Sequence, residues 1–169
     1  GITGSSGKTT NTTLIGEIMA QGGHLNTYVG GNIGRPLLDE VESMGPEDLA
    51  VLELSSFQLE LLPYSPKYAL VTNITPNHLD IHRTMDNYIQ AKRGIYSHQG
   101  PGDYAVFNYD DPLTVRLAEE CGSQVYFFSR LEEPRRGVFL REGMIVFKDL
   151  GFAKGKEHVL GPITMARLI

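Results

Sequence analysis

Short apolar runs alternate with stretches of helical periodicity from residue 1 to about residue 129. This alternation is typical of repeated strand-helix units, which build a mostly parallel sheet flanked by helices. Six runs have the length and residue types of strands. They lie at residues 1–3, 26–30, 48–54, 68–74, 103–109 and 124–129. We therefore expect an α/β fold with a sheet of about six parallel strands.

Helices are expected between these strands. The first is predicted over residues 8–21, where apolar side chains recur at i, i+3 and i+4, and the glycines at 22–23 close it. Its apolar stripe consists of Leu14, Ile15, Ile18 and Met19. Further helices are predicted at residues 35–44, 84–98 and 111–121.

The segment at residues 136–148 has a different pattern. In "GVFLREGMIVF", two β-rich runs are separated by "REG", which is a signal for a hairpin. We expect a small antiparallel appendage to the parallel sheet there.

Length and charge limit the class of protein. The 169 residues suit one domain with a sizeable core. The net charge of -5 argues against nucleic-acid binding, which depends on clustered Lys and Arg. No apolar run approaches the ~18 residues that cross a bilayer, and we see no secretory pattern. The single cysteine, Cys121, cannot form an internal disulfide, so we expect a cytoplasmic protein.

Both ends of the sequence suggest one domain of a longer protein. The first strand candidate has fewer residues than the usual five or so. The final residues, "GPITMARLI", are apolar and carry no closing signal. We therefore expect further domains in the complete polypeptide.

The stretch "TGSSGKTT" has the features of a phosphate-binding loop. Gly4 and Gly7 permit a tight turn, and successive backbone N–H groups, together with the start of the following helix, face an anion. Lys8 can reach the β- and γ-phosphates of a nucleotide, and a hydroxyl of Thr9 or Thr10 can bind magnesium. The strict motif has a further glycine at the position of Ile2, and a glycine turn that caps a helix is the alternative.

The second candidate segment is "LAVLELSSFQLE". Its apolar run ends in Glu53, which places a carboxylate at the edge of a parallel sheet where such folds bind ligands. That position suits a magnesium ligand, although a solvated strand-end Glu is the alternative. Ser55, Ser56 and Gln58 either supply hydrogen-bonding groups to a ligand or cap the next helix.

The third segment, "TNITPNHLDIH", follows another strand. His78 and Asp80 can therefore project into the same crevice as Glu53. A zinc site formed by His78 and His82 is disfavoured, because the Glu expected beside the first His is absent and no third ligand is evident. A surface turn is the alternative for this stretch alone.

Two further segments are weak when taken singly. "GGNIGRP" brings backbone and Asn32 near a ligand, or is a common glycine-rich turn before a helix. Lys92, within "YIQAKRGIY", has the pattern of a solvated helix lysine.

Six segments together resemble the central, ATP-binding domain of the Mur ligase family. They are "TGSSGKTT", "GGNIGRPL", "ELSSFQLE", "NITPNHLDIH", "YIQAKRGIY" and "FNYDDP", in order from residue 1 to about residue 112. The hairpin expected at 136–148 agrees with that domain. The resemblance implies that residues 1–169 are the central ATPase domain, and that the N-terminal UDP-binding domain and the C-terminal domain of the family lie outside this sequence.

The stretch "ELSSFQLE" narrows the resemblance, because other Mur ligases and the folylpolyglutamate synthetases differ just after the equivalent Glu. The implied activity is the ATP-dependent addition of D-glutamate to UDP-N-acetylmuramoyl-L-alanine in peptidoglycan precursor synthesis. The substrate carboxylate attacks the γ-phosphorus and forms an acyl phosphate and ADP. The amine of D-glutamate then displaces phosphate and forms an amide.

The resemblance also implies roles for the loop residues. Lys8 matches the phosphate-binding lysine of the family, with Thr9 and Thr10 near magnesium and the β- and γ-phosphates. The backbone of Gly4, Ser5, Ser6 and Gly7 matches the cradle around ATP. Ser6 departs from the Asn found in many relatives, which leaves the cradle intact and puts a side-chain contact there in doubt.

Further roles fall on the other segments. Glu53 and His78 match ligands of two magnesium ions, and Lys92 matches a lysine that the family carbamylates with CO2, which gives an anion that helps hold the second ion. Lys8, His78 and Lys92 are thus the expected catalytic residues.

Substrate contacts complete the implied site. Asn32, Ser55 and Gln58 match positions near the nucleotide and the muramoyl substrate, and His78 also lies near that substrate. The implied partners are the small substrates and the flanking domains of the same chain, without nucleic acid or membrane insertion, and a monomer is expected.

Other classes share only part of this pattern. A regulatory GTPase needs an NKxD motif after a late strand, where this chain has "NITP" and "NYDD". A small-molecule kinase can share the loop but does not need the other segments. Another Mur or folylpolyglutamate-type ligase, or a nucleotide-binding module that is inactive by itself, remains as an alternative.

Overall fold

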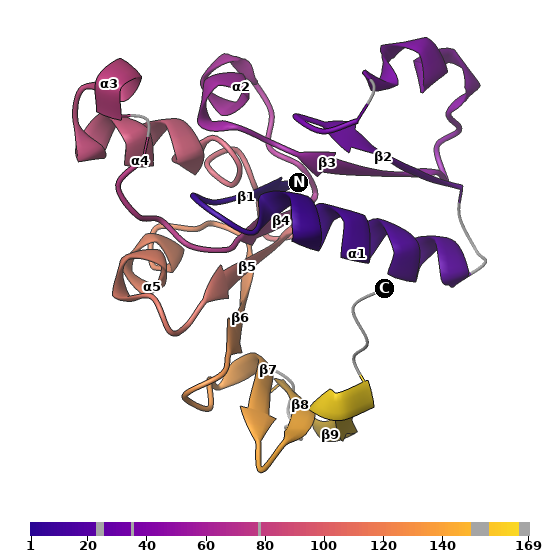
Figure 1. Ribbon diagram of the computed structural model, residues 1–169, viewed down its shortest axis with the longest axis vertical. Helices are drawn as coiled ribbons and strands as arrows, with labels where there is room; N and C mark the ends of the chain where they lie inside the picture. Colours follow the sequence, from indigo (N-terminus) through magenta and orange to yellow (C-terminus); the bar gives the residue numbers. More distant parts are fainter. Residues whose placement is uncertain (23–25, 35, 78, 150–155, 166–169) are drawn as a thin grey trace.

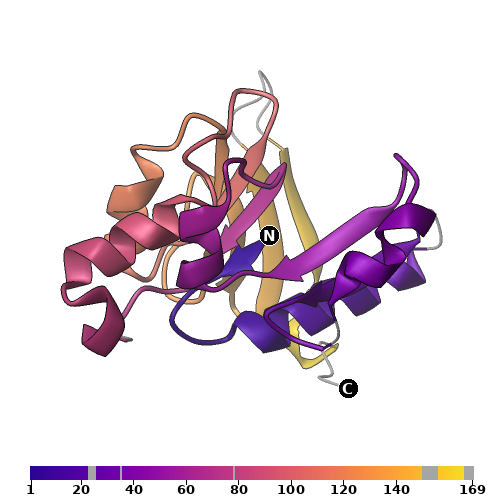
Figure 2. The ribbon, with the colours of Figure 1, turned by 90° about the horizontal axis from the view of Figure 1, so that it is seen from above.

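The computed structural model describes residues 1–22, 26–34, 36–77, 79–149 and 156–165. Within these residues, nine strands form a single sheet in the order β2-β3-β1-β4-β5-β6-β7-β8-β9 (Figures 1 and 2). The strands are β1 (Ile2–Thr3), β2 (Thr27–Gly31), β3 (Leu49–Glu53), β4 (Tyr68–Val71), β5 (Tyr104–Asn108), β6 (Gln124–Ser129), β7 (Arg136–Arg141), β8 (Met144–Asp149) and β9 (Lys156–Pro162).

Helices connect the parallel strands. They are α1 (Lys8–Gln21), η1 (Leu37–Ser43), α2 (Ser56–Leu61), α3 (Leu79–His82), α4 (Met85–Arg93), α5 (Pro112–Ala118) and η2 (Ile163–Met165). The predicted α/β class and the six predicted strands are therefore confirmed. The helix predicted at 35–44 is the 3-10 helix η1. The helix predicted at 84–98 ends at Arg93, and i→i+3 turns continue from there.

The predicted hairpin at 136–148 is confirmed as the antiparallel pair β7 and β8. It is not a separate appendage, because β7 pairs in parallel with β6 and so continues the main sheet. The parallel pairing is short and joins the last residues of β6, Phe127–Ser129, to Gly137–Phe139 of β7. A further strand, β9, pairs with β8 and was not predicted.

The direction of the crossovers decides which face each helix covers. The chain steps from β1 to β2 in one direction along the sheet and from β3 through β6 in the other. Right-handed crossovers therefore put α1 on one face and α2, α4 and α5 on the opposite face. The main core lies under these last three helices and contains Leu59, Tyr88, Ile95, Phe107 and Leu117, each at most 2% exposed.

Helix α1 turns its small residues toward the sheet. Thr12 and Gly16 are buried, and a Cβ at Gly16 would lie 2.3 Å from a methyl carbon of Val29. The apolar stripe that predicts this helix lies elsewhere on its surface, because Leu14 and Ile18 are 38% and 58% exposed. The apolar periodicity thus locates the helix correctly, but it does not identify the side of the helix that packs against the sheet.

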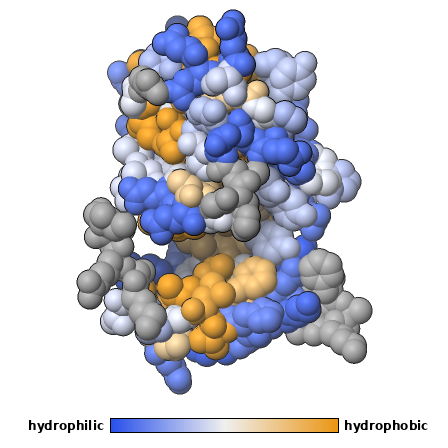
Figure 3. Space-filling view, turned by 90° about the vertical axis from the view of Figure 1, so that its right-hand side faces the viewer, coloured by the Kyte–Doolittle hydropathy of each residue, from blue (hydrophilic) through white to orange (hydrophobic). Residues whose placement is uncertain are grey.

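The α1 side of β4–β6 carries a row of aromatic rings. Tyr68 stacks on Tyr104 at 5.4 Å between ring centroids, and Tyr126 lies 6.3 Å from both Tyr104 and Phe147 of β8. Helix α1 packs on this face over β1–β3. Figure 3 shows apolar surface around a hollow between the upper part of the molecule and the antiparallel strands below. Parallel sheets are normally covered on both faces.

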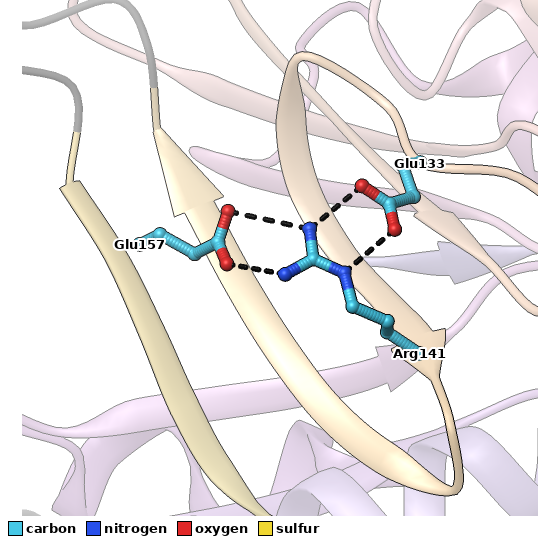
Figure 4. A network of polar contacts seen from close by, with 3 residues as sticks. All are labelled: Glu133, Arg141 and Glu157. Carbon is cyan, nitrogen blue, oxygen red and sulfur yellow. Dashed lines mark hydrogen bonds and ion pairs between the residues drawn. The ribbon is translucent and has the colours of Figure 1, made fainter.

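An exposed charge network ties the antiparallel strands together (Figure 4). Arg141 of β7 donates to both carboxylate oxygens of Glu133, at 2.6 and 2.7 Å, and to Glu157 of β9 at 2.6 Å. Exposed pairs of this kind contribute little to stability, so the network defines geometry more than it adds free energy.

None of the helices that the structure describes is both long and apolar enough to cross a membrane.

Candidate functional site

The candidate site lies where β1, β3 and β4 end. Ile2 pairs with Glu53, and Thr3 pairs with Val71, so the residues that follow β1 and β4 lie beside the end of β3. Open parallel sheets bind ligands at this carboxyl edge. The register therefore brings three of the predicted segments to one place.

The loop between β1 and α1 has the conformation that its glycines allow. Gly4 has φ of 154°, and a Cβ there would lie 1.9 Å from the Thr72 hydroxyl oxygen. Gly7 has φ of 78°, a left-handed conformation that favours glycine, and it is the N-cap of α1 without a side-chain cap. No acidic residue lies in the first turn of α1. Free N–H groups and the positive end of the helix dipole thus remain available to an anion.

Residues after β4 hold this loop in place. Ser5 donates its N–H to the Asn73 carbonyl at 2.9 Å, and Ser6 donates its N–H to the Asn73 side-chain oxygen at 3.0 Å. The Thr72 hydroxyl donates to the Ser6 carbonyl at 2.8 Å. Thr72 and Asn73 were not predicted as site residues. The polar pair "TN" at the end of a strand is the sequence signal that could have identified them.

Two lysines converge on the loop. Lys8 Nζ lies 3.1 Å from the Gly4 carbonyl oxygen, and Lys92 Nζ lies 3.0 Å from the same oxygen. Lys92 also donates to the Thr3 hydroxyl at 3.1 Å and is 2% exposed. The alternative interpretation of Lys92 as a solvated helix lysine is therefore wrong, because α4 packs over the end of β1 and buries the side chain.

Burial changes the acid-base behaviour of Lys92. Desolvation, and secondarily the positive charge of Lys8, lowers the pKa of Lys92 from 10.5 to about 7. Near neutral pH, Lys92 is therefore a neutral amine in a substantial fraction of the protein molecules, and the neutral amine is the nucleophilic form.

This lowered pKa predicts a pH dependence of stability. The unfolded chain keeps the ordinary pKa, so between pH 7 and 10.5 the folded state binds fewer protons than the unfolded state. The free energy of unfolding should rise with pH across that window, by up to about 1.4 kcal/mol per pH unit. Lys92→Met should lack this contribution. Urea unfolding of the wild type and of Lys92→Met at pH 7, 8 and 9 in CO2-free buffer measures this rise in the free energy of unfolding. An equal rise with pH in both proteins would contradict the lowered pKa of Lys92.

Glu53 is the buried carboxylate of the site, at 2% exposed. Its Oε2 accepts from the Thr9 hydroxyl at 2.7 Å, and its Oε1 accepts from the Asn32 side chain at 3.1 Å. The structure thus brings together the predicted residues of three segments. Thr10 lies exposed in the same first turn of α1.

The oxygen donors around Glu53 suit a hard cation. Mg²⁺ is usually held by one or two carboxylates together with phosphate oxygens and water, and Glu53 with the Thr9 hydroxyl provides such a set. Among the residues that the structure describes, there is no group of three or more His, Cys, Asp or Glu side chains that could hold a metal ion by themselves. Phosphate oxygens and water are the ligands that usually complete such a shell.

The predicted histidine, His78, lies outside the described residues, so its predicted metal, catalytic and substrate roles stay predictions. His82 is buried at 6% exposed, with Nε2 2.9 Å from the Ser56 hydroxyl and its ring stacked on Phe57. This packing makes His82 part of the contact between α2 and α4, because its ring also lies 5.3 Å from that of Tyr88. Asp80 is exposed in α3.

Ser55 and Gln58 form a capping box at the start of α2. The Ser55 hydroxyl accepts from the Gln58 N–H at 3.3 Å, and the Gln58 side-chain oxygen accepts from the Ser55 N–H at 2.9 Å. The capping alternative is therefore confirmed for these two residues. Both remain partly exposed, so the cap leaves surface near Glu53 for a ligand.

The loop, the two lysines and the buried carboxylate define a class of protein. A glycine-rich turn from a parallel strand into a helix, with a lysine at its end, binds nucleotide phosphates. The chain is a phosphate-loop α/β domain.

Comparison with known proteins gives the family. The family model described as Mur ligase middle domain matches residues 2–147, and the chain belongs to this family. The predicted resemblance is thereby confirmed. A relative from Pelotomaculum thermopropionicum, named UDP-N-acetylmuramoylalanine--D-glutamate ligase, is 55% identical over 146 residues, which cover 86% of this chain and 32% of that protein.

A second relative has the same name and comes from Symbiobacterium thermophilum. It is 51% identical over 150 residues, or 88% of this chain and 33% of that protein. The chain thus spans about a third of the length of these curated relatives.

Solved structures agree on the fold. MurF from Acinetobacter baumannii aligns with a TM-score of 0.63 at 23% identity, over 95% of this chain and 37% of that one. MurF from Thermotoga maritima, in complex with ADP, aligns with a TM-score of 0.62 at 19% identity, over 95% of this chain and 40% of that one.

Proposed function

We propose that residues 1–169 are the central, ATP-binding domain of a ligase that adds D-glutamate to UDP-N-acetylmuramoyl-L-alanine through an acyl phosphate. The observation that carries this proposal is the convergence of Lys8 and Lys92 on one carbonyl at the start of the phosphate loop. Burial, and secondarily the charge of Lys8, lowers the pKa of Lys92, so Lys8 is the cation at this point of the loop that a polyphosphate would meet. The names of the relatives from P. thermopropionicum and S. thermophilum support the choice of D-glutamate.

The reaction sets an electrostatic problem that these residues address. A substrate carboxylate and a triphosphate must approach each other, and each unit-charge repulsion at ~4 Å costs about 4 kcal/mol at an effective dielectric near 20. Lys8 offsets this charge from the end of the loop, and the N–H groups at the start of α1 offset it from the helix axis. Phosphoryl transfer depends mainly on such positioning and charge stabilisation.

Lys92 can change its charge. Its neutral amine attacks the carbon of CO2, one C–O π bond moves onto oxygen, and the nitrogen loses a proton to solvent, which leaves a carbamate anion. The lowered pKa of Lys92 makes the neutral amine available near pH 7. The product replaces a cation at the loop with an anion that can act as a metal ligand.

Magnesium is part of the proposal, with two ions expected. Glu53 and the Thr9 hydroxyl would hold one ion with the phosphates, with Thr10 close by, and His78 and carbamylated Lys92 would hold the other. When bound, the ions would neutralise charge on the β- and γ-phosphates. The described oxygen donors fit this role, as argued above.

The remaining predicted roles are retained as proposals. Asn32, which donates to Glu53, would lie near the nucleotide. Ser55 and Gln58 would contact the muramoyl substrate from the start of α2, with His78 near the same substrate. Flanking domains of the polypeptide would supply the UDP-binding surface and much of the contact to adenine and amino acid. We also propose a monomer in the cytoplasm, where ATP is available.

Isotope transfer tests the acyl phosphate directly. With ¹⁸O in both oxygens of the muramoyl-alanine carboxylate, the complete polypeptide should release phosphate that carries one ¹⁸O per turnover. The label moves because a carboxylate oxygen bonds to phosphorus and then leaves with it. A small-molecule kinase would instead give a phosphorylated product and no labelled phosphate. Release of unlabelled phosphate alone would contradict the mechanism.

The isolated domain should be inactive as a ligase. Residues 1–169 lack the proposed flanking domains, so we expect no D-glutamate-dependent phosphate release from ATP and UDP-N-acetylmuramoyl-L-alanine. The complete polypeptide, assayed in parallel, is the control. D-glutamate-dependent release by residues 1–169 alone would show that the flanking domains are not required.

A further inference from the structure

Tyr88 links the phosphate loop to the helix that carries Lys92. It lies in α4 one turn before Lys92 and is 1% exposed. Its hydroxyl oxygen is 3.0 Å from the Ser5 hydroxyl oxygen in the loop. The Lys92 Nζ atom lies 4.9 Å from the centroid of the Tyr88 ring. One side chain thus contacts both the loop and the buried lysine.

The hydrogen bonds around Ser5 determine the direction of this contact. The Ser5 hydroxyl donates its one proton to the Thr75 carbonyl at 2.8 Å and accepts from the Thr75 N–H at 2.9 Å. A hydroxyl has one donor and two acceptor sites, so Tyr88 must be the donor to the remaining lone pair. Ser5 is therefore fully bonded only when the Tyr88 hydroxyl is present.

We propose that Tyr88 is a positioning residue that holds the phosphate loop and Lys92 in register, by its hydroxyl on Ser5 and its ring face against the Lys92 amine. The inference rests on the proposed function, since it takes ATP as the ligand of the loop. Ser5 lies in the loop just before Gly7, the N-cap of α1, so a shift of Ser5 moves the loop that would hold the phosphates. Lys92 follows Tyr88 at i+4 on the same side of α4, so the same contact sets its distance from the loop.

Tyr88→Phe tests the hydroxyl while it keeps the ring. In the complete polypeptide we expect the KM for ATP to rise about fivefold and kcat to fall severalfold, with the KM for D-glutamate within twofold of the wild type. A purely structural defect would lower the fraction of folded enzyme and reduce kcat without a change in either KM. Thermal unfolding of each variant monitors that fraction.

Tyr96→Phe is the matched control. Tyr96 is buried to a similar degree, at 4% exposed, and its ring packs edge-on against Phe107 in the core. Removal of its hydroxyl should leave the KM for ATP within twofold of the wild type. The comparison separates loss of a buried hydroxyl in general from loss of the one bonded to Ser5.

A double-mutant cycle with Ser5→Ala provides the second readout. If Tyr88 acts through Ser5, then Tyr88→Phe should have no further effect on the KM for ATP in the Ser5→Ala background. Independent, multiplicative effects, or a KM for ATP in Tyr88→Phe within twofold of the wild type, would overturn the inference. Absence of ATP-dependent turnover in the wild type would instead contradict the proposed function, so the two failures are distinguishable.

Discussion

Replacement of Lys92 with alanine should abolish ligase turnover in the complete polypeptide, and added bicarbonate should not restore it. The variant lacks the amine that we propose reacts with CO2, and it leaves a space beside Thr3 and Gly4 where the side chain is buried. We expect a loss of at least about a thousandfold, because a group that acts on the transferring phosphoryl is removed entirely. Steady-state phosphate release with saturating substrates measures it.

Two controls accompany this variant. Lys67→Ala removes an exposed lysine that precedes β4 and should retain near-normal turnover. Wild-type protein depleted of CO2 should lose activity and regain it with bicarbonate, which Lys92→Ala cannot do. Near-normal turnover by Lys92→Ala would show that this buried lysine has no part in the reaction.

Lys8→Ala should have the second large effect, on the use of ATP. The Lys8 ammonium lies at the loop, 3.1 Å from the Gly4 carbonyl, and no other described side chain at the first turn of α1 carries a positive charge. Loss of this charge should reduce kcat/KM for ATP by about 10²- to 10³-fold. Binding of a fluorescent ATP analogue and steady-state kinetics measure the effect, with the KM for D-glutamate as an internal reference.

A conservative variant sharpens this test. Lys8→Arg keeps the charge but not the compact ammonium, so it should recover part of the affinity for ATP and little of kcat. Unchanged ATP affinity in Lys8→Ala would return the loop to the alternative interpretation, a glycine turn that caps α1.

The parts of the fold that depend on local pattern could be predicted from the sequence. Alternating apolar runs gave the strands β1–β6, and the S-x-x-Q pattern allowed the cap of α2 by Ser55 and Gln58. The position of β9 could not be predicted, because its pairing with β8 depends on tertiary context. The packed side of α1 was also hidden, since a small residue, Gly16, faces Val29.

The site shows the same division. Gly4, Gly7 and Lys8 form a contiguous motif whose chemistry follows from its own residues. Lys92 did not stand out, since its burial arises only when α4 packs over β1, and the resemblance to a family was needed to single it out. Tyr88 and Asn73 were missed because their partners, Ser5 and Ser6, are more than sixty residues away in the sequence.

The central claim is that these residues bind ATP for a ligase that is specific for D-glutamate. The most direct test is phosphate release by the complete polypeptide from ATP and UDP-N-acetylmuramoyl-L-alanine, with D-glutamate, L-lysine or meso-diaminopimelate as the amine. We predict turnover with D-glutamate and none above background with the other two. A preference for either diamino acid would contradict the account.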